Sequence, residues 1–279
     1  MNAHQALDIS LQPFYLSGTR GNIFCLFAPP RNKQAPVLLF LPSFAEELNR
    51  CRVMVALQAR KLAALGVGSL LIDYYGTGDS QGDFSQTDWQ QWKDDADTAY
   101  SWLADQGYSN IGLWGLRLGA LLATELACQQ PDRFIRLLLW QPVLDGSVLL
   151  TQFFRIRLAM LMDRGEPKET TKQMREHLRQ GHNLEVAGYE LTPQLVSAID
   201  EKKLSNYDTL NPALQIDWFE AVVEDGQTLS PASEKAIAAW LEKGIRVRPH
   251  TYSGPFFWQL HERELTPELI DKTTELFRN

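Results

Sequence analysis

The sequence predicts an α/β protein in which helices flank a mostly parallel sheet and a helical insertion interrupts the chain. Three observations lead to this prediction. Short apolar runs, such as 37–41, have the length and composition of strands buried on both faces. Stretches of helical periodicity alternate with these runs, as in βαβ units. Between about 144 and 211 the alternation stops, and the patterns are helical.

The first half of the chain contains most of the alternation. A hairpin of two strands is expected around 8–16 and 22–28, bounded by Pro29-Pro30. Further strands are expected at 37–41, 69–72, 111–115 and 135–140, and helices at 52–65, 87–105 and 118–129. The helix at 52–65 ends at Gly66, a typical helix stop.

The second half begins with the insertion and then resumes the alternation. Helices are expected at 148–161, 168–179 and 193–202, with an extended stretch at 185–191 as a candidate to lie over a pocket. A strand at 216–223, a helix at 233–243, a strand at 245–251 and a helix at 267–277 follow. The expected division is a core at 1–143, an all-helical cap at 144–211 and the rest of the core at 212–279. Such a cap would cover the carboxyl end of the sheet, where open α/β sheets bind ligands.

The composition excludes several classes of protein. The chain has 279 residues, 44% of them hydrophobic, which suffices for a large core without disulfides. A net charge of −7 argues against nucleic acid or an anionic membrane as partner. No signal peptide or membrane-spanning run is recognised. Three cysteines at unrelated spacings and five scattered histidines favour a reduced, cytoplasmic protein with no metal centre, and no cofactor is predicted.

The most informative motif is the segment 115–119, which has the sequence GLRLG between a predicted strand and a predicted helix. The α/β hydrolases carry Gly-x-Ser-x-Gly here, because the sharp turn that exposes the nucleophile needs small flanking residues. Both glycines are present, but Arg117 replaces the serine. Its protonated guanidinium has no lone pair to attack a carbonyl. The sequence therefore predicts an α/β-hydrolase fold without the hydrolase nucleophile.

Two roles for Arg117 remain open. The N-terminus of the following helix attracts anions, so Arg117 at its mouth would complete an anion site. Alternatively, Arg117 is an ion-pair partner for nearby carboxylates, Asp225 among them. Glu46 or Glu47 could face Arg117 or a cationic ligand group, although for Glu47 a position at the start of a helix is favoured over this role.

The other two members of a Ser-His-Asp triad are not both evident. Asp225, with Glu224 second, follows the strand at 216–223, as the triad acid does in this fold. In the loop after the last strand, Phe256-Phe257 stands where the base histidine would follow a glycine, and His261 comes a few residues late. Acyl transfer by a nucleophile and a base thus lacks two of its three groups.

Two further loops complete the predicted site. The backbone N–H groups of Phe44 and Leu118 occupy the positions that form an oxyanion hole. Ser43 is a conceivable displaced nucleophile, but no base is apparent beside it. The loop at 73–82 fits D-x-x-G-x-G-x-S-x-G, a marker of many α/β hydrolases, and we expect its glycines to serve as structural turns.

Several segments together resemble the α/β-hydrolase-fold proteins called exosortase A system-associated hydrolase 2. They are PSFAEELNRCRVMVALQARKLA, IDYYGTGDSQGDF, LWGLRLGALLA, WQPVLDG, TQFFRIRLA and LEVAGYEL. The resemblance extends over nearly the whole chain and includes the arginine in the elbow. It implies a cytoplasmic accessory role beside exosortase and the exopolysaccharide genes of the bacterial PEP-CTERM system, with proteins of that system as possible partners. The family name rests on fold analogy, and a fold does not determine an activity.

Three functions follow from these residues. The first is a hydrolase-like protein that lacks Ser-His-Asp catalysis and binds an anionic or acyl-bearing small molecule under its cap. The second is a genuine ester or thioester hydrolase, or an acyl transferase, with a displaced catalytic set such as Ser43 with His261. The third is a scaffold that binds protein partners through the cap and has no ligand.

Overall fold

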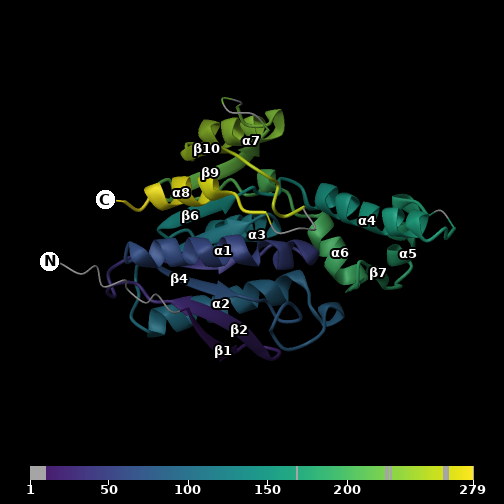
Figure 1. Cartoon of the computed structure of the whole chain (residues 1–279), viewed down its shortest axis with the longest axis horizontal. Helices are drawn as coiled ribbons and strands as arrows, with labels where there is room; N and C mark the ends of the chain where they lie inside the picture. The colour runs from purple at the N-terminus through teal and green to yellow at the C-terminus, as the bar shows by residue number, and fades with distance from the viewer. Residues whose placement is uncertain (1–10, 168, 224–225, 227, 260–263, 279) are drawn as a thin grey trace.

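The computed structural model describes residues 11–167, 169–223, 226, 228–259 and 264–278. An eight-stranded sheet forms its centre (Figure 1). In spatial order the strands are β1 (Gln12–Ser17), β2 (Asn22–Ala28), β4 (Gly68–Ile72), β3 (Val37–Leu41), β5 (Ile111–Leu116), β6 (Arg136–Trp140), β9 (Gln215–Val222) and β10 (Val247–Ser253). Strand β2 runs antiparallel to both of its neighbours, β1 and β4, and the strands from β4 to β10 run parallel to one another. This confirms the predicted α/β-hydrolase architecture.

Helices cover both faces of the sheet, because alternate side chains of each buried strand point to opposite sides. Leu38 and Trp114 pack in the apolar cluster that includes residues of α1 (Glu46–Ala64) and α8 (Pro267–Glu275). Leu39 and Leu113 pack in the cluster on the other face. That cluster includes residues of α2 (Trp89–Asp105), α3 (Leu118–Gln129) and α7 (Pro231–Glu242).

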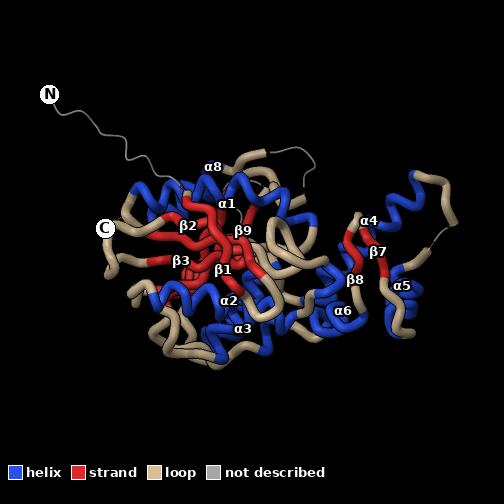
Figure 2. The backbone as a smooth tube through the Cα atoms, turned by 90° about the horizontal axis from the view of Figure 1, so that it is seen from below, coloured by secondary structure: helices blue, strands red, loops and turns tan. Residues whose placement is uncertain are grey.

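The insertion between β6 and β9 lies to one side of this core (Figure 2). It contains α4 (Gly146–Asp163), α5 (Thr171–Arg179) and α6 (Pro193–Asp200). The prediction that it holds helices alone was wrong, because β7 (Leu184–Val186) and β8 (Tyr189–Leu191) pair as an antiparallel hairpin. Ala187-Gly188 joins them with both φ angles positive, the two-residue turn that suits a tight hairpin. Helical periodicity does not reveal strands of three residues.

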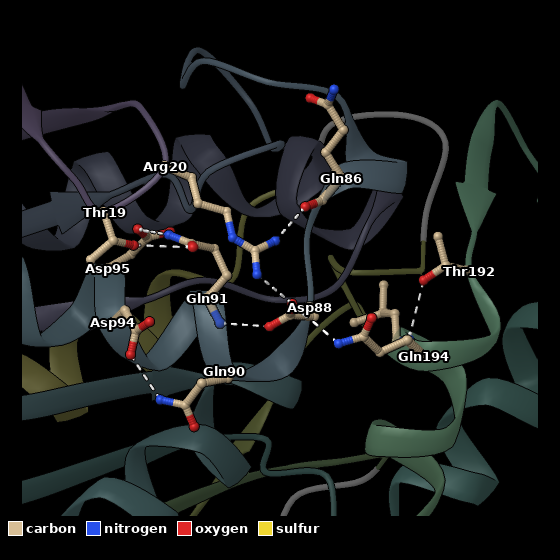
Figure 3. Close-up of polar contacts among 11 residues, drawn as sticks. Thr19, Arg20, Gln86, Asp88, Gln90, Gln91, Asp94, Asp95, Thr192 and Gln194 are labelled. Atoms are coloured by element: carbon tan, nitrogen blue, oxygen red, sulfur yellow. Dashed lines mark hydrogen bonds and ion pairs between the residues drawn. The ribbon is translucent and has the colours of Figure 1, made fainter.

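Polar contacts join the insertion to the core at several points. Glu125 of α3 is 3% exposed. Its carboxylate accepts a hydrogen bond from the Tyr207 hydroxyl at 2.6 Å and forms an ion pair with the Lys202 ammonium at 3.1 Å. Asp88, the N-cap of α2, accepts from Arg20 at 2.8 Å and from Gln194 of α6 at 3.4 Å (Figure 3). These charged contacts hold the end of the insertion against the helices that flank the sheet.

Within the described ranges, no helix is both long enough and apolar enough to span a bilayer.

Asp95 is a fully buried carboxyl group under the loop that follows β4. It accepts a hydrogen bond from the Gln91 side chain at 2.7 Å (Figure 3) and one from the Tyr75 backbone N–H, also at 2.7 Å. Burial nevertheless dominates and raises the pKa of Asp95 from 3.8 to about 6. The protonated form is therefore favoured by folding.

We predict that Asp95 makes the protein less stable as pH rises from about 4 to about 6. Because the folded pKa lies above the unfolded value, its stabilising contribution is complete below pH 4 and is lost as the group ionises. The loss amounts to about 2–3 kcal/mol. In urea unfolding, the stability of the wild type relative to that of Asp95→Asn should fall by this amount across the pH range. Asp105→Asn, an exposed change on the same helix, is the control, and equal slopes in all three proteins would contradict the prediction.

Candidate functional site

The elbow between β5 and α3 has the strained turn of a nucleophile elbow with an arginine at its centre. Arg117 adopts φ 55° and ψ −117°, a conformation that costs on the order of 1–3 kcal/mol for a residue with a side chain. Its N–H donates to the Trp140 carbonyl at 3.0 Å, and its carbonyl accepts from the Val143 N–H at 3.2 Å. Neighbouring backbone thus holds the turn from both sides.

The two elbow glycines are required because backbone segments touch there. A Cβ on Gly119 would collide with the carbonyl oxygens of Leu41 and Pro42, and one on Gly115 would collide with the backbone of Ala120. The first turn of α3 therefore packs directly against the end of β3.

The side chain of Arg117 is bound to a carboxylate of the protein. Its Nε lies 3.2 and 3.3 Å from the two carboxylate oxygens of Glu47, and its Nη2 lies 3.1 Å from Glu47 Oε1. Its guanidinium carbon lies 5.3 Å from the centre of the Trp258 ring, within cation–π range. The Arg117 and Glu47 side chains are only 11% and 18% exposed. Of the two roles left open, the observed contact is the ion pair.

Glu47 reaches Arg117 because α1 begins directly after β3. Ala45, the residue before the helix, has φ 50° and ψ −124°, nearly the same strained conformation as Arg117. The helix N-terminus that follows favours acidic residues, and both Glu46 and Glu47 lie in its first turn. Glu46 lies 3.7 Å from Arg50 and accepts from the Tyr189 hydroxyl at 3.3 Å. Burial and the charge of Glu46 raise the pKa of Tyr189 to about 12, so this contact between β8 and α1 persists at neutral pH.

A cavity of about 380 Å³ lies over this ion pair, between α4 and the core. It is lined by Phe44, Glu46, Glu47, Arg50, Arg117, Leu149, Gln152, Phe153, Arg155, Ile156, Trp258 and Gln259. Its wall combines apolar and aromatic side chains with three arginines and two glutamates. Among the described residues that line it, none is a serine, threonine, cysteine or histidine.

Four of the predicted site residues line the cavity, namely Phe44, Glu46, Glu47 and Arg117, and two others, Ser43 and Leu118, do not. Ser43 is 4% exposed, and its hydroxyl has no hydrogen-bond partner within the described part of the chain. It lines a separate space of about 140 Å³ together with Cys51, a thiol whose pKa is raised by burial. Leu118 is buried beside Gly119 in a much smaller gap.

The next predicted residues are those at the acid and base positions of the triad. Asp225, Glu224 and His261 lie outside the described residues, so their roles stay predictions. Phe257 is 2% exposed and packs edge-on against Trp258 at 5.2 Å between ring centres. An aromatic side chain thus fills this part of the loop after β10.

His250 of β10 has structural partners. Its Nε2 lies 3.0 Å from the fully buried carboxylate of Asp217, and its ring stacks on Phe219 at 4.5 Å. Arg136 and Arg248 bind the same carboxylate at 2.9 and 2.8 Å. His250 is therefore partnered by Asp217 and Phe219, and it is not among the residues that line the cavity.

The loop at 73–82 serves structure, as expected. The Asp73 carboxylate accepts from Arg52 at 2.6 Å and from the Asp79 N–H at 2.9 Å, which ties the loop to α1. Gly78 has a positive φ, and a Cβ there would collide with the Asp73 and Arg52 side chains.

The cap wall of the cavity is not evident from the sequence. Leu149, Gln152, Phe153 and Ile156 recur at spacings of three and four residues along α4, which places them on one face of the helix. That periodicity predicts a buried face equally well whether it contacts the core or a cavity, so the pattern alone could not identify a site.

The parallel sheet, the strained elbow and the inserted cap define the class of α/β-hydrolase-fold proteins. A model of the X-Pro dipeptidyl-peptidase (S15) family matches residues 24–202, more than half of the sequence, and the chain belongs to that family. The match includes the elbow and most of the insertion, and it ends before β9 and β10.

Solved structures share the fold at low sequence identity. Est1E from Butyrivibrio proteoclasticus with bound ferulic acid has a TM-score of 0.64 at 14% identity, covering 95% of this chain and 96% of its own. A thermostable carboxyl esterase from Bacillus coagulans has a TM-score of 0.62 at 13% identity, covering 96% and 97%. The thioesterase domain of the curacin biosynthetic pathway has a TM-score of 0.59 at 12% identity, covering 97% and 100%. A search among curated proteins finds no significant match.

We predict that Gly119→Ala destabilises the protein by about 3 kcal/mol, because the added methyl group must displace backbone carbonyls and not flexible side chains. Gly107→Ala is the matched control: nothing lies near its Cβ position, and only its positive φ opposes the change, at about 1 kcal/mol. Urea unfolding of the two variants measures the difference. Equal losses would show that α3 can move away from β3.

We also predict that Arg117 and Glu47 are energetically coupled. A double-mutant cycle with Arg117→Met and Glu47→Gln should give a coupling energy of about 1–3 kcal/mol in unfolding, because either single change leaves a poorly solvated charge. The exposed pair Arg179–Glu176, with side chains 65% and 54% exposed, is the control and should give a coupling energy near zero. A similar, small value for both pairs would contradict the assignment.

Proposed function

We propose that this protein binds an anionic or acyl-bearing small molecule in the cavity between α4 and the core, without Ser-His-Asp catalysis. One observation carries the proposal: at the position of the nucleophile, the Arg117 guanidinium is held by Glu47 and covered by Trp258. A group that is permanently protonated and already paired can neither attack an ester nor act as a base.

The rest of the cavity supports a binding role. Covalent acyl transfer needs a nucleophile within hydrogen-bond reach of a base, and the described lining residues supply neither a hydroxyl nucleophile, a thiol nor an imidazole. They supply an apolar wall from Leu149, Phe153 and Ile156 and one net positive charge. Est1E, which shares the fold, holds ferulic acid. An apolar body with an acidic or acyl group is the ligand class that suits such a cavity.

The sequence resemblance supports a setting for this function. The segments around the elbow, the first cap helix and the cap hairpin resemble exosortase A system-associated hydrolase 2, which suggests a cytoplasmic accessory role in export of surface polysaccharide or protein. Proteins of the exosortase system would then be its partners, and the ligand would belong to that process.

We predict that the purified protein hydrolyses p-nitrophenyl butyrate no faster than buffer and is not labelled by a fluorophosphonate probe. Arg117→Ser should stay inactive as well, because a serine restored to the elbow still lacks an apparent base. An active esterase run in parallel shows that the assay works, and unfolding curves show that the variant is folded. Hydrolysis that is abolished by Ser43→Ala or His261→Ala would overturn the proposal. It would establish the alternative, an ester or thioester hydrolase or an acyl transferase with a displaced catalytic set.

A further inference from the structure

The three arginines of the cavity differ in how their charges are used. Arg117 is paired with Glu47. Arg50 donates to the Gln259 carbonyl at 2.9 Å and lies 3.7 Å from Glu46. Both belong to the floor of the cavity, on the core side, and both are already satisfied by the protein.

Arg155 differs from these two. It lies on α4, on the cap side of the cavity, and its side chain makes no hydrogen bond, ion pair or ring contact within the described part of the chain. Gln152, one turn earlier on the same helix, is also without a partner there and lines the same cavity. By contrast, Arg157 of this helix is engaged by Glu169 at 2.8 Å and by the Glu185 carbonyl at 2.9 Å. The two arginines of α4 therefore differ, because Arg157 has partners in the protein and Arg155 has none among the described residues.

The surroundings of Arg155 are apolar on one side and open on the other. Leu149, Phe153 and Ile156 line the cavity from the same helix face, whereas Gln152 and Arg155 are exposed and stand at its rim. A ligand that satisfies this face must present hydrogen-bond acceptors at the rim and an apolar body inside. A guanidinium offers two parallel N–H donors that match the two oxygens of a carboxylate.

We propose that Arg155, assisted by Gln152, is an anion subsite that selects a monocarboxylate with an apolar body. The carboxylate binds at the rim, on the cap, and the apolar end extends toward Trp258 and the Arg117–Glu47 pair. This inference rests on the proposed binding function and makes it specific: the positive charge in the elbow is structural, and the charge that recognises the ligand belongs to the cap.

The test compares two probes of nearly equal shape, 4-phenylbutyrate and its neutral amide, by isothermal titration calorimetry at low salt. The wild type should bind the carboxylate about tenfold more tightly than the amide, as a charge-assisted hydrogen bond provides. Arg155→Gln should bind the carboxylate about tenfold more weakly than the wild type does, and its affinity for the amide should change by less than about twofold. Arg164→Gln, which removes the same charge from the exposed end of α4, is the matched control and should retain the preference.

The outcomes separate the two proposals. If both probes bind and Arg155→Gln leaves the preference for the carboxylate intact, the subsite is wrong while the binding function stands. If neither probe binds to the wild type, the binding function fails, and the subsite fails with it. If Arg164→Gln weakens the binding of the carboxylate as much as Arg155→Gln does, the preference comes from the overall positive charge near α4. The proposed subsite is then also refuted.

Discussion

The direct contact between the first turn of α3 and the end of β3 determines the geometry of everything around the cavity. Because Gly119 has no side chain, the helix approaches the carbonyls of Leu41 and Pro42 closely. This approach brings the elbow beside the loop after β3, and that loop starts α1 through a second strained residue, Ala45. Two helix N-termini therefore meet at one edge of the sheet, and Arg117 from one and Glu47 from the other line a common cavity.

An arginine at this edge needs a partner, because a poorly solvated positive charge is costly. Glu47 meets that need from the adjacent helix, where the helix N-terminus already favours a carboxylate. The pair and the aromatic ring of Trp258 form part of the floor of the cavity, and side chains of the cap helix α4 bound the space on the other side. In the binding function proposed above, recognition of the ligand therefore depends on the surface that covers the elbow.

The sequence predicted the core well because its signals are local. A run such as 37–41 is apolar without interruption, and Gly66 marks the end of a helix, so the strand β3 and the end of α1 were located correctly. The start of α1 was placed too late, at 52 and not at Glu46, because the first turn of the helix is acidic and not apolar. The ion pair between Arg117 and Glu47 was only one of several options, since residues 70 positions apart carry no signal of their contact. The short hairpin of β7 and β8 was missed as a pair, and the cavity face of α4 could not be distinguished from an ordinary core face.

The elbow turn is held by backbone partners outside it, the carbonyl of Trp140 and the N–H of Val143. Its shape therefore does not depend on the side chain that it carries, since no contact of that side chain is needed to form it. In evolutionary terms, the residue at the centre of such a turn can be exchanged while the fold is kept. A lineage can exchange a serine for an arginine at this position without rebuilding the turn, provided that a residue such as Glu47 partners the new charge.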